Sequence, residues 1–120
     1  MEKAGYELSE RPVRKAGGRG GHKLLNKNPM IRLNVFVKVK SENRKEVLDT
    51  LLELAEQSQK EKGCIAYGIF ESSTDKEVLM ICETWSGEEE LSAHEKTHHF
   101  VTLVGKTQQL AEMKLERFMF

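Results

Sequence analysis

Residues 78–94 read VLMICETWSGEEELSAH and mark the passage from a strand into a helix. The first half is mostly apolar and ends at the only tryptophan of the chain, as expected for a strand buried in a sheet. Ser86 is followed three residues later by Glu89, which is the pattern of a capping box and predicts that a helix begins at Ser86. The chain is therefore expected to turn from sheet to helix within a few residues.

This turn is expected to bring three polar or aromatic side chains near one another. Glu83 and Trp85 stand at the end of the expected strand, and His94 follows in the expected helix. A carboxylate, an indole and an imidazole at one place can line a pocket for a flat, polarisable small molecule. The junction is therefore the first candidate site.

The rest of the chain from residue 30 onwards alternates between the periodicities of strands and helices. Apolar residues at every second position, or in short runs, predict strands over residues 31–39, 64–71, 77–85 and 111–120. Apolar residues at helical spacing predict helices over residues 41–62, over 86–98, and over 100–109 with Val101 and Val104 inward. Ser41 is expected to cap the first of these helices, and Gly63 is the usual kind of residue just past a helix end.

The resulting order β-α-β-β-α-(α)-β is that of the ferredoxin-like βαββαβ fold, an α+β class in which helices cover one face of an antiparallel sheet. Phe36, Phe70 or Ile69, Phe118 and Phe120 supply more large apolar groups than one helix-covered face can use. A bare sheet face that carries aromatic side chains usually marks an interface. We therefore predict a homodimer that packs sheet against sheet.

The bulk composition argues against several classes of function. The 120 residues suffice for one domain, and 19 basic residues balance 19 acidic ones, so the whole chain gives no electrostatic case for nucleic acid or a membrane. No apolar run approaches the roughly 20 residues of a bilayer span. Two cysteines outside a Cys-x-x-Cys spacing do not make a disulfide framework, which favours a cytoplasmic protein with reduced thiols.

Residues 1–29 differ in character from the rest. They hold seven basic residues against three acidic ones, include the run GGRGG, and have almost no periodic apolar positions. Such a segment cannot bury enough apolar surface to offset its chain entropy. We expect a disordered basic arm, which could bind RNA or an acidic partner, or else a non-native extension. The extension is favoured because Met30 lies one residue before the first strand, so the folded domain is expected over residues 30–120.

Four short motifs, in this order and spacing, resemble the antibiotic biosynthesis monooxygenase family. They are the segments 63–67 (GCIAY), 83–85 (ETW), 91–94 (LSAH) and 97–100 (THHF). The sequence is most similar to the small quinol monooxygenase-type members. The resemblance implies a ferredoxin-like protomer in a dimeric α/β barrel. Members of known activity include cofactor-free monooxygenases of quinols and polycyclic aromatics, haem-degrading proteins, and isomerases of small phosphorylated carbonyl compounds.

Departures from the family's patterns argue against several of these activities for this chain. The strand before Trp85 lacks the asparagine of the aromatic-polyketide monooxygenases, and residues 101–104 (VTLV) lack the histidine that ligates iron in the haem-degrading members. The domain over residues 30–120 holds twelve basic residues against sixteen acidic ones, which gives little support to a phosphate-binding isomerase.

The resemblance implies that His94 is the pocket histidine, and His94 is our candidate catalytic residue. An imidazole with a pKa near about 6.5 can take a proton from a phenol or enol. A deprotonated hydroquinone can then pass an electron to O2 directly, so neither a cofactor nor a metal is expected. The alternative is a structural histidine that is bonded to Glu83 or to a backbone carbonyl.

The candidate substrate-binding residues each have an alternative role in packing. Trp85 would stack on a flat substrate or fill the wedge between strand and helix. Tyr67 would offer its hydroxyl to a substrate oxygen or pack as a strand aromatic. Asn34 would bond a ligand carbonyl or lie on an exposed face.

Glu83 and His98 complete the set of candidate substrate-binding residues. Glu83 would orient His94 or form a cross-strand pair with a basic residue. His98, together with His99, would shape the rim of the pocket. His94 and His98 at i and i+4 also suit a metal, but no third ligand stands at a natural spacing, so we expect no metal site.

We therefore expect a cofactor-independent monooxygenase or quinol oxidase that acts with O2 on a small aromatic or quinol substrate. It would be a cytoplasmic homodimer without nucleic-acid or membrane partners. The alternatives are a non-catalytic dimeric α/β barrel that binds a ligand or a partner, and an isomerase of a small carbonyl compound. The discriminating feature is whether the pocket at His94 is open, or filled by Phe36, Tyr67, Phe70 and Phe100.

Overall fold

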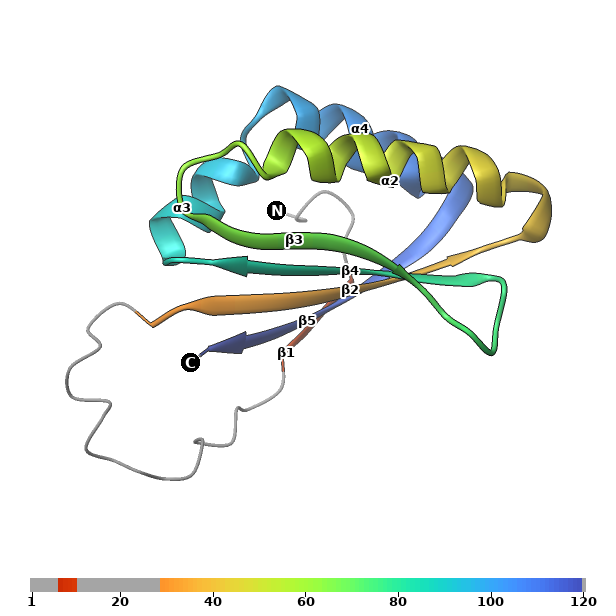
Figure 1. Ribbon diagram of the computed structural model, residues 1–120, viewed down its shortest axis with the longest axis horizontal. Helices are drawn as coiled ribbons and strands as arrows, with labels where there is room; N and C mark the ends of the chain where they lie inside the picture. Colours follow the sequence, from red (N-terminus) through yellow and green to blue (C-terminus); the bar gives the residue numbers. More distant parts are fainter. Residues whose placement is uncertain (1–6, 11–28, 120) are drawn as a thin grey trace.

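The computed structural model describes residues 7–10 and 29–119. In chain order the elements are β1 (Glu7–Glu10), β2 (Ile31–Val39), the 3-10 turn η2 (Ser41–Asn43), α2 (Arg44–Ser58), β3 (Cys64–Glu71), β4 (Val78–Trp85), α3 (Glu88–His94), α4 (His98–Leu110) and β5 (Ala111–Met119). They form two layers, with the helices over one face of a single sheet (Figure 1).

The sheet is built around β2, which pairs antiparallel with both β4 and β5. β3 extends the sheet antiparallel to β4, and β1 joins the other edge parallel to β5, so the order is β1-β5-β2-β4-β3. The alternation predicted for residues 31–39 is seen in β2, where every second side chain is buried. Period-two burial is what a strand shows when one face is covered and the other is not.

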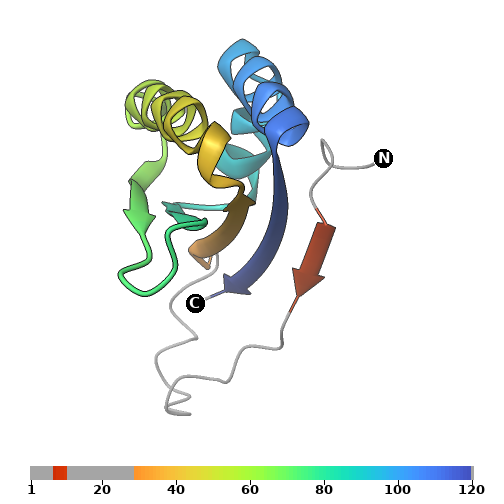
Figure 2. The same cartoon turned by 90° about the vertical axis from the view of Figure 1, so that its right-hand side faces the viewer.

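The helix layer consists mainly of α2 and α4, which lie side by side over the sheet (Figure 2). Each helix buries residues at helical spacing, such as Val47, Leu51 and Leu54 in α2 and Leu103 and Val104 in α4. These apolar stripes meet the inward side chains of the strands in one core. The predicted ferredoxin-like α+β fold is confirmed, and β2, β3, β4 and β5 are its antiparallel strands.

The predicted arm falls almost wholly outside the described residues. Within it, Glu7–Glu10 form strand β1, in register with residues 114–117 of β5. The character of the rest of residues 1–29 stays a prediction. Among the described residues, no helix is both long and apolar enough to cross a membrane.

Two predicted helix caps are wrong. α3 begins at Glu88 with Gly87 as its N-cap and no capping side chain, so Ser86 and Glu89 do not form a capping box. Ser41 opens the 3-10 turn instead of capping α2 with its hydroxyl.

The prediction that Val101 points inward is also wrong, since its side chain is exposed. Helix α4 starts at His98 and is capped by Thr97, and its buried stripe runs through Phe100, Leu103, Val104 and Thr107. Val101 stands next to this stripe and is turned to the outside. Val104, the other residue predicted inward, is buried.

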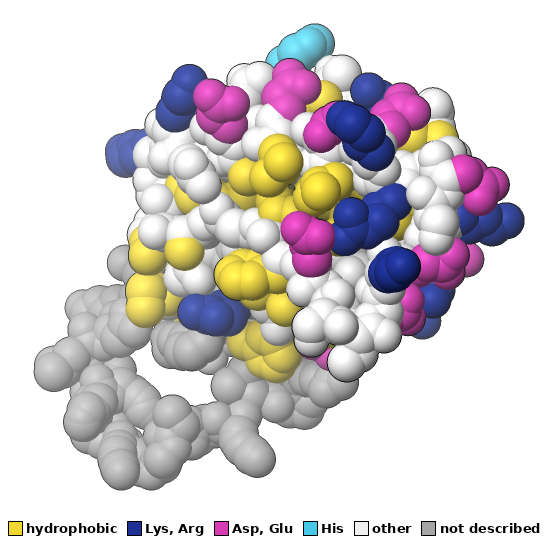
Figure 3. All heavy atoms as spheres, turned by 45° about the vertical axis from the view of Figure 1, so that its right-hand side comes forward, with side chains coloured by type: hydrophobic (Ala, Val, Ile, Leu, Met, Phe, Trp, Pro, Cys, Tyr) yellow, Lys and Arg dark blue, Asp and Glu magenta, His cyan; other side chains and the backbone are white. Residues whose placement is uncertain are grey.

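The sheet face opposite the helices carries an apolar row across three strands. Phe36 and Phe70 both stand in register with Met80, and their side chains are 39% and 53% exposed. Figure 3, which views the molecule from the side with the helix layer uppermost, shows hydrophobic side chains among mixed acidic and basic ones. The predicted sheet-to-sheet homodimer stays a prediction. Phe120, one of the residues on which the homodimer prediction rests, lies outside the described residues.

Candidate functional site

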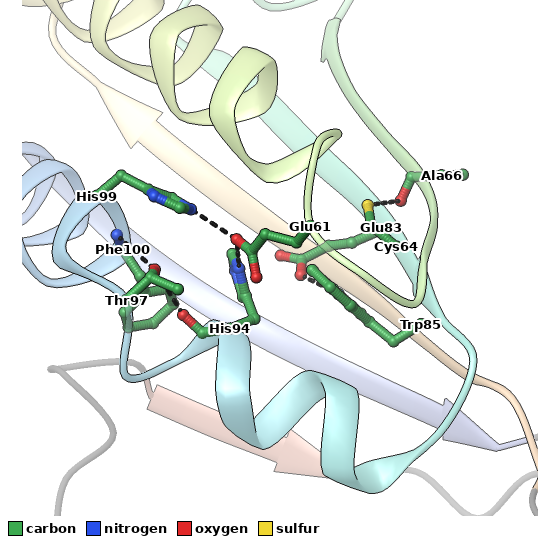
Figure 4. Close-up of polar contacts among 9 residues, drawn as sticks. All are labelled: Glu61, Cys64, Ala66, Glu83, Trp85, His94, Thr97, His99 and Phe100. Carbon is green, nitrogen blue, oxygen red and sulfur yellow. Dashed lines mark hydrogen bonds and ion pairs between the residues drawn. The ribbon is translucent and has the colours of Figure 1, made fainter.

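His94 is the last residue of α3, and its side chain is almost completely buried. Its Nδ1 lies 2.8 Å from Oε2 of Glu61, a residue in the turn between α2 and β3. Nε2 of His99, near the start of α4, lies 2.6 Å from the same oxygen. One carboxylate oxygen thus joins two imidazoles from different helices (Figure 4).

The turn that holds Glu61 is fixed by Gly63. Gly63 has a φ of +85°, a conformation that residues with a Cβ rarely adopt. A Cβ at this position would lie 2.2 Å from Cγ of Glu90 in α3. The Gly63 carbonyl also accepts a hydrogen bond of 2.9 Å from the backbone N–H of Ser86. The absence of a side chain therefore lets this turn lie directly against the β4–α3 junction.

Thr97 fixes the step from α3 to α4. Its Oγ1 donates to the carbonyl of His94 at 2.8 Å and accepts from the N–H of Phe100 at 3.1 Å. The hydroxyl therefore caps α4 while it holds the end of α3. This step sets the two helices at an angle that turns both His94 and His99 toward Glu61.

Aromatic rings surround the imidazole of His94. Trp85 lies against it with ring centroids 4.5 Å apart, and Phe100 meets it edge-on at 5.0 Å. Tyr67 stands edge-on at 5.8 Å and also contacts Trp85. All three aromatic residues are buried, so the imidazole is packed between rings rather than exposed in an open cleft.

Glu83 is a second carboxyl group beneath this cluster, and it is fully buried. Its Oε1 accepts a hydrogen bond of 2.8 Å from Nε1 of Trp85. Burial raises the pKa of Glu83 to about 8; the Trp85 bond opposes this shift, whereas the charges of Glu95 and Glu61 add to it. Glu83 is therefore mostly protonated at neutral pH. Both predicted roles of Glu83 are wrong. Glu83 does not orient His94, whose Nδ1 is held by Glu61, and it forms no cross-strand ion pair within the described part of the chain, because it faces the helix layer and bonds the indole.

Burial lowers the pKa of His94, and the nearby His99 lowers it further. The hydrogen bond and the charge of Glu61 raise this pKa, but burial is the larger effect. His94 is therefore neutral at neutral pH. With Nδ1–H donating to the Glu61 carboxylate, Nε2 keeps its lone pair. This Nε2 is buried and has no hydrogen-bond partner among the described residues.

The structure brings together four of the six predicted site residues, namely Tyr67, Glu83, Trp85 and His94. Asn34 is not among them, because its side chain alternates with the buried Leu33 and Val35 and so lies on the face of the sheet away from the helices. His98 is exposed, and its Nε2 lies 3.4 Å from Oγ1 of Thr102.

Glu61 takes part in the cluster but was not predicted. Nothing in its local sequence sets it apart from the other charged residues near the end of α2. The only signal for its position was the neighbouring Gly63, which marks the end of a helix. The chain that leaves this helix must return to the sheet edge beside β4, where β3 begins. His99, predicted only at a pocket rim, is in contact with the centre of the cluster.

The cluster can do two kinds of chemistry. A carboxylate that holds Nδ1–H leaves Nε2 as a proton acceptor, which is the arrangement of an oriented general base. The ligand atoms of Glu61, His94 and His99 also lie within 4.8 Å of one another, close enough to share a metal ion.

Comparison with known proteins places this chain in a family. The family model described as antibiotic biosynthesis monooxygenase matches residues 30–106. The candidate monooxygenase YcnE of Bacillus subtilis (strain 168) is 32% identical over 87 residues, which span 72% of this chain and 92% of YcnE.

Solved structures agree with this result. A conserved protein of unknown function from Bacteroides thetaiotaomicron, described as a possible oxidoreductase, is 59% identical with a TM-score of 0.77, over 78% of this chain and 99% of that chain. A candidate antibiotic biosynthesis monooxygenase from Nitrosomonas europaea is 19% identical with a TM-score of 0.70, over 78% of this chain and 90% of that chain, and supports the fold alone. With the ferredoxin-like fold and a family model that matches most of the domain, the chain belongs to the antibiotic biosynthesis monooxygenase family.

Proposed function

We propose that this protein is a cofactor-independent monooxygenase or quinol oxidase that acts with O2 on a small aromatic or quinol substrate. The observation that carries the proposal is the pairing of Glu61 with His94, in which Nδ1 is held at 2.8 Å and the buried Nε2 has no hydrogen-bond partner among the described residues. The candidate monooxygenase YcnE supports the same reaction class.

The proton acceptor in this proposal is Nε2 of His94. Glu61 holds the imidazole in the tautomer that leaves Nε2 free, and its charge stabilises the imidazolium that forms when a phenol proton arrives. The apolar rings of Trp85, Tyr67 and Phe100 exclude water, which strengthens the ion pair between Glu61 and the protonated His94. Their π faces also suit a flat aromatic substrate.

The overall reactions balance without an external reductant. In the oxidase reaction a hydroquinone loses two electrons and two protons to O2, giving a quinone and H2O2. In the monooxygenase reaction a phenol with a free ring C–H takes one oxygen atom at that carbon. Its O–H and C–H hydrogens leave with the second oxygen atom as water, and a quinone remains. Both begin with transfer of the phenol proton to His94, since the phenolate gives an electron to O2 more readily than the phenol does.

A second candidate function rests on the burial of the same histidine. His94 and Trp85 are fully covered, and Tyr67 and Phe100 pack against the imidazole. A substrate reaches Nε2 only if one of these rings moves. If none does, the cluster is a core element, and the protein is a non-catalytic α/β barrel that binds a ligand or a partner at another surface.

The predicted homodimer and the cytoplasmic location remain part of this proposal. The exposed Phe36 and Phe70 in register with Met80 support a dimer through the open sheet face. Asn34 lies on that same face, so it would line the dimer interface rather than contact a substrate at His94.

The test is oxygen uptake by chelator-treated, flavin-free protein against a panel of reduced quinols and naphthols, corrected for autoxidation. His94→Ala is expected to lower the rate by about 10²–10⁴-fold, the usual contribution of a general base. His98→Ala is the matched control, since this histidine is exposed and its contact is with Thr102.

Circular dichroism must show that both variants are folded. A folded His94→Ala protein that consumes oxygen at the full rate would refute His94 as the base. No uptake by the unmodified protein with any substrate of the panel would favour the non-catalytic candidate. Assay of H2O2 then separates the oxidase from the monooxygenase.

A further inference from the structure

We propose that Glu61, His94 and His99 form a binding site for a divalent transition-metal ion, with Zn2+ as the preferred probe. Their ligand atoms, one carboxylate oxygen and two imidazole nitrogens, all lie within 4.8 Å of one another. Both nitrogens already point at one oxygen, at 2.8 and 2.6 Å. An ion near that oxygen would be in reach of all three ligands after small side-chain shifts.

The three ligands come from separate segments whose backbones are each held in place. Glu61 stands in the turn fixed by Gly63, and His94 and His99 stand on either side of the step fixed by Thr97. The ring of His94 is further held between Trp85 and Phe100. Such preorganisation favours metal binding, because less conformational freedom is lost when the ion enters.

The donor set has the composition of a metal site with an open position. Two imidazoles and one carboxylate bind Zn2+ in many catalytic sites, where a water completes the tetrahedron. The same three donors bind ferrous iron in the 2-His-1-carboxylate arrangement. The set offers no thiolate, since Cys64 and Cys82 are not in it, so soft monovalent ions are not favoured.

The three ligands differ in their exposure to solvent. The side chains of Glu61 and His99 are 15% and 17% exposed, whereas His94 is 1% exposed. An ion would therefore enter past Glu61 and His99, with His94 as the deepest ligand.

Metal binding and the proposed base reaction compete for one imidazole. The ion takes the lone pair of Nδ1 of His94, so the proton carried by Nδ1 moves to Nε2, and no net proton is lost from this residue. Nε2 then donates instead of accepting and cannot take a proton from a substrate. Bound metal should therefore inhibit the oxidation. This inhibition rests on the proposed function, whereas the binding of the ion does not.

The binding test uses the full chain, freed of metal, and titrates Zn2+ alone by calorimetry or against a chromogenic chelator. We expect one saturable ion per chain at this site. Glu61→Gln and His99→Ala should each weaken binding by more than about tenfold, because even the loss of a second-shell partner costs about 10–100-fold. His98→Ala is the matched control and should bind as the unmodified protein does. Both ligand variants avoid the buried His94, whose removal endangers folding.

Co2+ provides a spectroscopic reading of the same site. We expect visible absorption bands of a nitrogen- and oxygen-ligated ion that are present in His98→Ala and lost in His99→Ala. Absence of saturable Zn2+ binding, or equal binding in Glu61→Gln, His99→Ala and His98→Ala, would overturn the proposal.

The outcomes for the two proposals are separable. Zn2+ titration requires neither a quinol nor O2, so a bound ion in a protein without oxygen uptake would leave the metal site standing and refute the oxidation. Oxygen uptake by the metal-free protein that Zn2+ does not inhibit, with no binding in the titration, would refute the metal site alone.

Discussion

Nδ1 of His94 and Oε2 of Glu61 lie 2.8 Å apart, although the two residues are separated by 33 positions in the sequence. The contact joins the end of α3 to the turn after α2, and it decides which nitrogen of His94 is free. The proposed base and the proposed metal site both depend on it.

Glu61→Gln is expected to lower kcat of the proposed oxidation by about 10–100-fold with little change in KM. The glutamine oxygen still accepts the Nδ1–H bond, but it carries no charge to stabilise the imidazolium, and a charged partner contributes about 1.5–3 kcal/mol. Steady-state oxygen uptake measures this change. Glu56→Gln, at an exposed position of α2, is the control. Equal rates in the two variants would mean that Glu61 does not act on the base.

The stability of the protein should decline between about pH 4.5 and about pH 8 through Glu83. Burial raises the pKa of Glu83 from 4.5 to about 8, so the native state binds its proton more tightly than the unfolded chain. The stability given by the neutral form is complete below about pH 4.5 and is lost as the pH rises through about 8.

Glu83→Gln should remove this dependence while keeping an oxygen acceptor for Nε1 of Trp85. Urea unfolding at pH 5 and pH 9 measures it. The variant should be more stable than the unmodified protein at pH 9, by an amount on the order of a few kcal/mol, and of similar stability at pH 5. If the difference between the two proteins is the same at both pH values, Glu83 is not protonated in the native state.

Gly63→Ala should destabilise the domain by about 2–4 kcal/mol. The added Cβ meets Cγ of Glu90 at 2.2 Å, and the φ of +85° is strained for alanine. Gly105→Ala is the matched control, because a Cβ there meets nothing within 4 Å and the residue lies inside α4. That change should stabilise the domain by about 0.5–1 kcal/mol. Denaturant unfolding compares them, and a neutral Gly63→Ala would show that the turn has room to shift.

Phe36→Asp should convert the proposed homodimer to a monomer. The side chain stands in the apolar row with Met80 and Phe70, and a carboxylate buried at a sheet-to-sheet contact would have no partner. Sedimentation velocity measures the mass. Val101→Asp, at an even more exposed apolar position on the helix layer, should leave the dimer intact. Dissociation by Val101→Asp but not by Phe36→Asp would place the interface on the helices instead.

The sequence by itself determined which helices and strands follow one another over residues 30–119. Alternation over residues 31–39 and helical spacing in α2 and α4 are local signals, since each residue's burial follows from its neighbours within a turn or a strand. The βαββαβ order then leaves few ways to form one antiparallel sheet with helices on one face. The local motif from Glu83 to His94 was likewise enough to bring Trp85, Glu83 and His94 into one cluster.

Only the tertiary structure decided which other residues join this cluster. Glu61 enters because the turn at Gly63 lies against the β4–α3 junction, and His99 replaces His98 because the chain stops one helix at His94 and starts another after Thr97. Asn34 falls on the other face of the sheet because the pleat of β2 turns Leu33 and Val35 inward. Periodicity within a segment cannot fix such contacts, because they depend on strand register and on the angle at which one element meets another.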